Sequence, residues 1–374
     1  MKRIRIVADD TIPYLKGVFE SVPSVEINYL PARGFTAESV RDADVLFVRS
    51  IDKCTKDLLA GSSVRLIVTA TIGFDHIDTK FCDENGIVWR NAPGCNASSV
   101  GMYVLSSLIA LSLKNGKPLA GKTIGIVGVG HVGSEVERLC TAMGLRVLRC
   151  DPPRAELEGP DGFVPLQVLL EQSDIITLHV PYTKEGEYAT HHLADFRFFA
   201  RLKKSPCFIN SCRGAVHCTE ALKDAYKNGL VSSIILDCWE KEPVIDRDLL
   251  SFSFLASPHI AGFSADGKAN GTRMCVQAIA DFFGLDVSVG SIFPVSPENP
   301  YIDLDKWTEH RIEHAVLSVY NPQQIDKMLR ANPSDFEYLR NHYNHPREFP
   351  AYTVLNATAE ERAVLHKLGF ENVP

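Results

Sequence analysis

The sequence GKTIGIVGVGHVGSEVERLCTAMGLRVLRCD, from Gly121 to Asp151, decides the fold. Residues 123–127 predict a short buried strand, because they are almost wholly apolar. A helix is expected from there to Met143, Gly144 ends it, and residues 145–149 predict a second strand. A strand, a helix and a second strand in this order are typical of a parallel α/β sheet.

The turn after the first strand has the spacing of a dinucleotide-binding loop. Gly128, Gly130 and Gly133 form the pattern Gly-x-Gly-x-x-Gly. In such a loop the glycines allow a tight turn, a close approach of pyrophosphate to the backbone, and close packing of the helix on the strand. Asp151 follows Gly133 by 18 residues, near the spacing of an acid that binds the ribose hydroxyls. The stretch predicts an NAD-binding Rossmann domain, and the alternative is a glycine-rich turn in another α/β protein.

Composition limits the classes of protein that fit. The 374 residues suffice for two or three domains, and the net charge of −7 without a basic run argues against a nucleic-acid partner. The ten cysteines lack zinc-type spacing, so no metal is expected. Without a secretory signal at the start, they predict reduced thiols in a cytoplasmic protein. The most apolar segment, residues 100–113, is expected to be too short to span a membrane.

Strand and helix patterns alternate on both sides of the glycine-rich turn. The strands expected before it are residues 4–8, 45–48, 65–69 and 87–89. The strands expected after it are residues 175–180, 207–211, 233–237 and 254–256. Long helices are expected at residues 96–113 and 268–283, and the second should pack back on the first domain.

The expected fold is α/β with two doubly wound parallel-sheet domains. Residues 1–97 and 264–285 predict a flavodoxin-like substrate domain, because this part has no phosphate-binding glycine triplet. Residues 98–263 predict the Rossmann NAD domain. Residues 286–374 change to proline-rich loop, short helices and one strand-like run, without a catalytic motif, and predict a small α+β C-terminal domain.

Three polar residues follow predicted strands, where open α/β sheets bind their ligands. They are Arg213 in NSCRG, Glu242 in DCWEKEP and His259 in SPHIAG. Singly, each is more often a surface arginine, a solvated turn glutamate or a packed loop histidine. Together they fit the oxidation of a 2-hydroxy acid. Arg213 would bind the carboxylate, His259 would take the hydroxyl proton, and Glu242 would orient the imidazole.

These motifs resemble those of the D-isomer-specific 2-hydroxyacid dehydrogenases. In that family NxxRG, DxxxxEP and PHxxG carry the arginine, glutamate and histidine of the active site. The matching segments are residues 210–214, 237–243 and 258–262, and the resemblance covers about residues 1–285. It implies an NAD-dependent oxidoreductase.

Further stretches resemble one subfamily over essentially the whole chain. These stretches are VRS at residues 48–50, GFDHID at 73–78, APGCNA at 92–97, PHIAGFS at 258–264, REF at 347–349 and HKLGF at 366–370. The resemblance implies a small phosphorylated 2-hydroxy acid as substrate. It also implies a homodimer that forms through the C-terminal domain.

The resemblance also implies site residues. Ser50 and Thr71 would contact the substrate. The NAD contacts would be His131, Val132, Asp151, Val180, Cys212, Asp237 and Gly262. Phe263 stands at a substrate-binding position where the subfamily usually has tyrosine, and Met102 stands where it usually has an acid.

The substrate phosphate needs a cation, and Arg49 at the end of a predicted strand is the first candidate. Arg347 is the second, although it would act from the partner subunit and an interface salt bridge is the more frequent role for such a residue. The alternatives for the whole protein are a dehydrogenase for another D-2-hydroxy acid, such as 3-phosphoglycerate or glycerate, and an NAD-sensing protein similar to a corepressor.

Overall fold

The computed structural model describes residues 3–374, and these residues form two compact units. Unit 1 contains the chain up to Asn96 together with Ser264–Val295. Unit 2 contains Ala97–Phe263 together with Ser296–Pro374. The C-terminal segment therefore belongs to the same compact unit as the glycine-rich turn.

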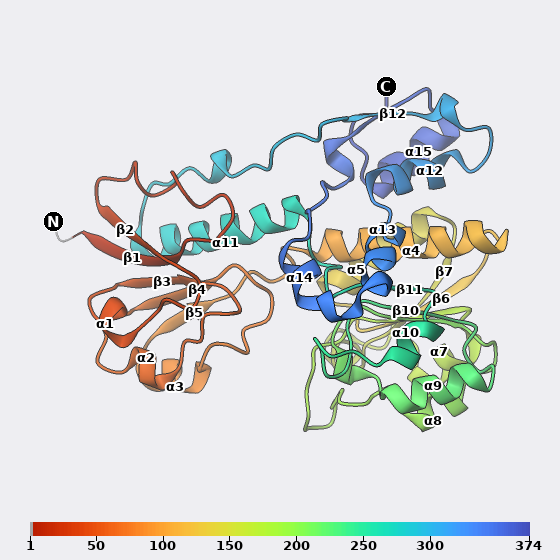
Figure 1. The fold of residues 1–374 in the computed structure, drawn as a ribbon, viewed down its shortest axis with the longest axis horizontal. Helices are drawn as coiled ribbons and strands as arrows, with labels where there is room; N and C mark the ends of the chain where they lie inside the picture. Colours follow the sequence, from red (N-terminus) through yellow and green to blue (C-terminus); the bar gives the residue numbers. More distant parts are fainter. Residues whose placement is uncertain (1–2) are drawn as a thin grey trace. The chain divides into compact units, whose positions relative to one another are not determined.

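Unit 1 has a five-stranded parallel sheet in the order β2-β1-β3-β4-β5. Its strands are β1 (Ile4–Asp9), β2 (Val25–Leu30), β3 (Val45–Val48), β4 (Leu66–Thr69) and β5 (Val88–Arg90). The sequence patterns missed β2, because this edge strand alternates polar and apolar residues and is only half-buried. Helices α1 (Ala37–Val40), α2 (Lys56–Leu59) and α3 (Thr79–Glu84) cover one face, and α11 (Ala265–Phe283) covers the other (Figure 1).

Alternation along the central strands gives unit 1 two separate cores. Phe47 and Val68 point to one face and pack in a cluster with Ile279 of α11. Leu46 points to the opposite face and packs in a second cluster with Leu59 of α2. The period-2 geometry of a strand therefore explains why these strands are apolar at every position.

Unit 2 has a six-stranded parallel sheet in the order β11-β10-β9-β8-β6-β7, as expected for a Rossmann domain. Its strands are β6 (Thr123–Val127), β7 (Arg146–Cys150), β8 (Ile175–Leu178), β9 (Cys207–Asn210), β10 (Ser233–Leu236) and β11 (Leu255–Ala256). Its surrounding helices are α4 (Ala97–Asn115), α5 (His131–Ala142), α6 (Pro152–Glu158), α7 (Leu166–Gln172), α8 (Phe196–Ala200), α9 (Thr219–Lys227) and α10 (Arg247–Phe252). Helices α4 and α5 lie on one face of the sheet, and α8 and α9 lie on the other (Figure 1).

Helix α4 corrects one expectation from the sequence. It has 19 residues and a mean hydropathy of 1.3, so by length and composition it could cross a membrane. The expectation that this segment is too short is wrong, because the helix extends at both ends of the apolar run. However, 78% of its apolar window is buried inside the protein, and Leu105, Leu108 and Ile109 pack in the core of unit 2. Its burial is that of a core helix.

The C-terminal segment has the expected α+β character. Strands β12 (Tyr301–Asp303) and β13 (Thr353–Leu355) pair in parallel. The helices of the segment are α12 (Arg311–Val319), α13 (Gln323–Ala331), α14 (Phe336–Asn341) and α15 (Ala359–Leu368). Helix α12 packs on α4, α13 on β11, and α15 on α5.

Short 3-10 helices occur along the whole chain, at η1 (Gly214–Val216), η2 (Val289–Ser291), η3 (Leu304–Lys306), η4 (Pro333–Asp335) and η5 (Phe349–Ala351).

Candidate active site

Three neighbouring strands of unit 2 carry the candidate catalytic residues. Arg213 follows β9, Glu242 follows β10 and His259 follows β11, and these three strands are adjacent in the sheet. A side-chain carbon added at Gly214 would meet the Trp239 carbonyl oxygen at 2.0 Å. The turn of Arg213 therefore packs directly on the loop of Glu242, and only glycine fits there.

Glu242 and His259 form a hydrogen-bonded pair. Nδ1 of His259 lies 2.5 Å from Oε1 of Glu242, and the Trp239 N–H donates to Oε2 at 3.2 Å. Burial favours the neutral form of Glu242, but His259, the Trp239 N–H and a charge from Arg340 together hold the pKa of Glu242 below its usual range. An ionised Glu242 keeps the proton on Nδ1, and within residues 3–374 no hydrogen bond occupies Nε2 of His259.

Asp237 shapes the loop that carries His259. Its Oδ1 accepts the Ile260 N–H at 2.7 Å and the Ser257 hydroxyl at 2.6 Å, and its Oδ2 accepts the Ala261 N–H at 2.9 Å. The Asp237 carbonyl accepts the His259 N–H at 2.8 Å, and His259 itself has a left-handed φ of 57°. Burial raises the pKa of Asp237, although the charge of His259 and these hydrogen bonds oppose the rise.

Arg213 is held by its own turn. The Asn210 side chain donates to the Arg213 carbonyl at 2.9 Å and accepts the Cys212 N–H at 3.0 Å. Nη1 of Arg213 donates to the Cys212 carbonyl at 2.8 Å. The other guanidinium N–H groups make no hydrogen bond to residues 3–374, so they are available to a carboxylate.

A second histidine–glutamate pair joins Glu240, of the segment that carries Glu242, to His192 in the loop before α8. Nε2 of His192 is 2.7 Å from Oε1 of Glu240, whose Oε2 accepts the Thr219 N–H at 2.7 Å. Burial opposes the ionisation of Glu240, but the hydrogen bonds from Thr219 and His192 lower its pKa. This pair ties the loop before α8 to the start of α9, which the sequence did not indicate.

The glycine-rich turn has the cradle that a pyrophosphate needs. Gly128 has a φ of 86°, and an added side-chain carbon would meet the His179 carbonyl at 2.6 Å. A carbon added at Gly133 would meet the Gly128 carbonyl at 2.1 Å. Gly130 faces open space and precedes α5, which begins at His131. The free N–H groups of this helix start therefore fit the phosphates of NAD.

Asp151 lies at the end of β7 and braces the same turn. Its Oδ2 accepts the Val129 N–H at 2.8 Å, and its Oδ1 accepts the Arg154 N–H at 3.2 Å. The two flanking arginines are engaged elsewhere: Arg154 pairs with Glu158 at 2.6 Å, and Arg149 donates to the Gly162 carbonyl at 2.8 Å. Arg154 is therefore held by Glu158, whereas within residues 3–374 only Nε of the Arg149 guanidinium donates a hydrogen bond.

The remaining predicted NAD contacts lie at the same edge of the sheet. His131 and Val132 open α5, and Val180 and Cys212 follow the neighbouring strands β8 and β9. Gly262 ends the loop that Asp237 shapes. The structure thus brings the predicted NAD contacts together with Arg213, Glu242 and His259 in one unit.

The predicted substrate contacts Arg49, Ser50 and Thr71 lie in unit 1, after the neighbouring strands β3 and β4. Arg49 donates from Nη1 to the Thr11 hydroxyl at 2.6 Å, and its backbone N–H donates to Asp52 at 3.0 Å. Thr71 donates to the Gly73 carbonyl at 2.8 Å, and Ser50 is exposed.

Asp52 is buried beneath the turn of Arg49. Its Oδ1 accepts the Arg33 N–H at 3.0 Å. Burial raises the pKa of Asp52 to about 6; hydrogen bonds from the Arg33 and Arg49 backbones lower it, and the neighbouring Asp9 carboxyl raises it. The sequence analysis did not predict this acid pair.

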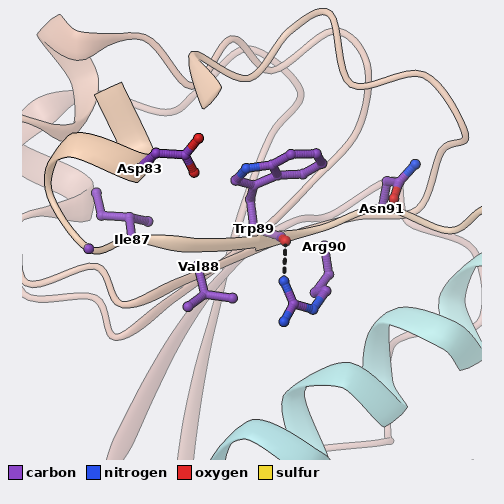
Figure 2. A pocket seen from close by; sticks show the side chains of 7 residues that line it. Asp83, Ile87, Val88, Trp89, Arg90 and Asn91 are labelled. Carbon is purple, nitrogen blue, oxygen red and sulfur yellow. Dashed lines mark hydrogen bonds between the residues drawn. The ribbon is translucent and has the colours of Figure 1, made fainter. Parts of the chain in front are cut away.

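A pocket of about 550 Å³ lies in unit 1 along the edge strand β5. Trp89 and Arg90 point to opposite sides of this strand, and Arg90 donates to the Trp89 carbonyl at 2.9 Å (Figure 2). None of the predicted site residues lines this pocket. Pocket size is therefore no guide to the chemistry of this protein.

The C-terminal segment contributes contacts that the sequence analysis missed. Asp326 accepts the Ala256 N–H at 2.8 Å, and Arg330 donates to the carbonyls of Leu250 and Ser253, both at 2.7 Å. Asp326 therefore occupies an N–H of the edge strand β11, and Arg330 joins α13 to the end of α10, directly before that strand. Their spacing of four on a helix was the available signal, but the partner strand could not be read from it.

The two positions that depart from the subfamily have different surroundings. Phe263 directly follows the histidine loop, and its ring lies 5.7 Å from the His345 ring and 5.8 Å from the Arg340 guanidinium. Met102 is only 2% exposed and belongs to the core around α4. Phe263 is therefore at the site, and Met102 is a packing residue.

Two families match parts of the chain. Residues 109–261 match the family described as "D-isomer specific 2-hydroxyacid dehydrogenase, NAD binding domain". Residues 295–369 match a family described as "Domain of unknown function (DUF3410)". The first match confirms the resemblance and the NAD-binding domain expected from the glycine-rich turn.

Solved structures share the fold. D-lactate dehydrogenase from Aquifex aeolicus, in complex with NAD and lactic acid, is 26% identical with a TM-score of 0.60, over 75% of this chain and 95% of that one. NAD-bound 3-phosphoglycerate dehydrogenase from Entamoeba histolytica is 26% identical with a TM-score of 0.64, over 75% and 96%. The protein is thus an NAD-dependent oxidoreductase.

Curated relatives match along almost the whole chain. The erythronate-4-phosphate dehydrogenase of Porphyromonas gingivalis is 50% identical over 98% of this chain and 100% of its own length. The proteins of the same name from Bacteroides thetaiotaomicron and Pectobacterium carotovorum are 47% and 37% identical, over 94% and 98% of this chain and 99% and 98% of their own lengths. The chain therefore belongs to the family of the erythronate-4-phosphate dehydrogenases and carries the NAD-binding domain of the D-isomer-specific 2-hydroxyacid dehydrogenases.

Proposed function

We propose that this protein oxidises 4-phospho-D-erythronate at C2 to 2-oxo-3-hydroxy-4-phosphobutanoate, with NAD as hydride acceptor, in the biosynthesis of pyridoxal 5′-phosphate. The observation that carries the reaction type is the His259–Glu242 pair, 2.5 Å apart, on the strand edge that also bears Arg213 and the glycine-rich turn. The names of the full-length relatives support the substrate.

His259 acts as the general base in this proposal. Its Nδ1 proton is held by Glu242, so Nε2 accepts the proton of the C2 hydroxyl. The imidazolium that forms is stabilised by the ionised carboxylate of Glu242. Arg213 binds the substrate carboxylate with its free guanidinium N–H groups and thereby orients C2.

The residues that would hold NAD are those at the strand ends of unit 2. Gly128, Gly130 and Gly133 give the pyrophosphate room at the start of α5. Asp151 would accept the ribose hydroxyls with the lone pairs that Val129 and Arg154 leave free. The cofactor supplies the hydride acceptor, and the protein supplies position and charge.

The resemblance to the subfamily also implies substrate contacts from residues of unit 1. Ser50 and Thr71 would contact the substrate, and Arg49 is a candidate for its phosphate. Arg347, from a partner subunit, is the weaker candidate for that contact.

We also propose that the protein is a cytoplasmic homodimer that forms through residues 286–374. These residues fold into ordered helices and strands, yet they carry none of the three catalytic motifs. The mass of the full chain in solution, measured by light scattering, tests the dimer directly. A monomer at micromolar concentration would contradict it.

A substrate panel with NAD tests the proposed function. The purified protein should turn over 4-phospho-D-erythronate with a higher kcat/KM than 3-phosphoglycerate, glycerate or unphosphorylated D-erythronate. Preference for another D-2-hydroxy acid would keep the chemistry and change the substrate. NAD binding without turnover of any member of the panel would favour a sensor.

A further inference from the structure

An arginine of the C-terminal segment lies beside the candidate catalytic pair. Helix α14 is anchored by Phe336 and Leu339, which are 1% and 7% exposed, and Arg340 is its penultimate residue. The Arg340 guanidinium lies 5.8 Å from the centroid of the Phe263 ring. Because Phe263 is only four residues after His259 in the same loop, the C-terminal segment places a positive charge at the edge of the site.

The charge of Arg340 is not neutralised by a partner. Within residues 3–374 the Arg340 guanidinium makes a cation–π contact with the Phe263 ring, and it makes neither a hydrogen bond nor an ion pair. Its field nevertheless reaches Glu242 and contributes to the lowered pKa of that carboxyl. A half-buried guanidinium with five unused N–H donors is a binding group for an anion.

The sequence from Arg340 to Arg347 adds a second arginine, with Glu337 and Glu348 on either side of the stretch. The stretch from Arg340 to Arg347, RNHYNHPR, contains two arginines and two histidines and has no acid, in a chain whose net charge is −7. The His345 ring packs on the same Phe263 ring. Local positive charge at a site of an acidic protein indicates an anionic ligand.

The substrate of the proposed function carries two anionic groups, a carboxylate and a phosphate. Arg213 serves the carboxylate, and Arg49, the other candidate for the phosphate, already donates to the Thr11 hydroxyl at 2.6 Å. We propose that Arg340 binds the phosphate group of the substrate, so that the C-terminal segment determines the preference for a phosphorylated acid. This inference rests on the proposed function. The guanidinium lies over the Phe263 ring, and its N–H groups, which make no hydrogen bond within residues 3–374, are available to the phosphate oxygens.

Two other roles for Arg340 predict different kinetics. If Arg340 only keeps Glu242 ionised, its removal changes the pH–rate profile equally for phosphorylated and unphosphorylated substrates. If it only packs on Phe263, its removal lowers the melting temperature and leaves the substrate preference unchanged. A phosphate contact instead raises KM for the phosphorylated substrate alone.

The test compares Arg340→Ala, Arg340→Gln and Arg340→Lys with the unchanged protein, using 4-phospho-D-erythronate and D-erythronate. Loss of a charge-assisted contact should raise KM for the phosphorylated acid roughly 10- to 100-fold in the Ala and Gln variants, with a small change in kcat. KM for D-erythronate should change less than about threefold, because it lacks the partner charge. The Lys variant should recover part of the loss, since it keeps the charge without the planar fork.

Lys327→Ala is the matched control, because it removes an exposed positive charge from the same segment without touching the site. Its KM for both substrates should be unchanged. Equal losses on both substrates in the Arg340 variants, or a normal KM for the phosphorylated one, would overturn the proposal.

The activity of the wild-type protein tests the proposed function independently of the Arg340 variants. No turnover of 4-phospho-D-erythronate by the unchanged protein would refute the proposed function. In that case isothermal titration of the NAD complex with inorganic phosphate still tests Arg340: weaker binding in Arg340→Gln than in Lys327→Ala supports an anion site, and equal binding refutes it.

Discussion

Asp237 of unit 2 and Asp52 of unit 1 shape loops in the same way but in opposite surroundings. Both are at most 2% exposed, and both accept backbone N–H groups from a loop that bears predicted site residues. Asp237 is surrounded by donors and by His259, whereas Asp52 faces a second acid, Asp9. A buried aspartate that accepts backbone N–H groups of a loop thus occurs in two different electrostatic environments.

The difference shows what a buried carboxylate can do besides chemistry. At Asp237, three N–H and O–H donors partly offset the cost of burial, so the carboxyl group holds the His259 loop by hydrogen bonds. At Asp52, burial and the neighbouring Asp9 carboxyl raise the pKa to about 6, so protonation of this acid begins at a higher pH than for an ordinary aspartate. Asp151 holds its turn in the same way as these two acids, since both of its oxygens accept backbone N–H groups.

The largest expected effect concerns the residue that the Asp237 loop presents. His259→Ala should lower kcat by about 10²–10⁴-fold, because the general base is lost. NAD affinity, measured by fluorescence titration, should stay within a factor of about three, because the glycine-rich turn is untouched. The control is His192→Ala, which removes the histidine that pairs with Glu240. Near-normal turnover of His259→Ala would refute the mechanism.

Asp237→Asn should have the next largest effect, because an amide can accept on only one side where the aspartate accepts on both. One N–H of the loop then meets another donor, which should cost about 1–3 kcal/mol in the free energy of unfolding and lower kcat roughly tenfold or more. Urea denaturation and steady-state kinetics measure the two effects. An unchanged stability would mean that the loop keeps its shape without this carboxylate.

Asp151→Ala tests whether the Asp151 carboxylate determines the preference for NAD over NADP. NAD should be preferred over NADP by the wild-type protein, because Asp151 repels a 2′-phosphate and Arg154 is held by Glu158. In the variant, the ratio of kcat/KM for NAD to that for NADP should fall on the order of tenfold. Equal efficiency of the unchanged protein with both cofactors would refute the assignment.

Glu242→Gln should shift the pH dependence of the oxidation more than its maximal rate. The imidazolium of His259 loses the carboxylate that stabilises it, so the ascending limb of the pH–rate profile should move down by about one pH unit. Glu240→Gln is the matched control, because Glu240 lies in the segment that carries Glu242 and pairs with His192. If both variants shift the profile equally, Glu242 has no special link to the base.

Asp9→Asn sharpens the comparison on the side of unit 1. The pKa of Asp52 is raised from 3.8 to about 6, so the folded state holds a proton that the unfolded state has lost. Stability from this group is therefore present below pH 4 and falls as pH rises towards 6, by about 1–2 kcal/mol.

In Asp9→Asn, the amide nitrogen can take the place of Oδ2, which is buried without a donor, and the acid pair disappears. The fall in stability between pH 4 and 6, measured by urea denaturation, should shrink by roughly half or more. Asp42→Asn is the control, because Asp42 is 73% exposed and should leave the curve unchanged. A curve for Asp9→Asn identical to that of the wild-type protein would show that Asp9 does not raise the pKa of Asp52.

Local patterns in the sequence predicted the parts of the site that local structure builds. The glycine spacing predicted β6, the turn and α5, since steric limits within a few residues require those glycines. The strand ends predicted that Arg213, Glu242 and His259 lie at one edge of the sheet, because adjacent parallel strands place their loops together.

Long-range contacts explain what the sequence could not predict. The pairing of Asp52 with Asp9, and that of Asp326 with the Ala256 N–H, join residues that are 43 and 70 positions apart. Periodicity carries no signal for such pairs. The length of helix α4 was misjudged because polar residues, at 98–99 and 114–115, continue the helix beyond the apolar run.

The hydrogen bonds from Asp326 to β11 and from Arg330 to the end of α10 have a consequence for synthesis on the ribosome. The two-residue strand β11 and the His259 loop emerge long before α13, so the last edge of the sheet stays unsealed while about a fifth of the chain is still being made. The nascent protein therefore carries an open sheet edge that is closed only by the final segment. Ribosome stalling before residue 326 should leave a chain that chaperones recognise and that has no working active site.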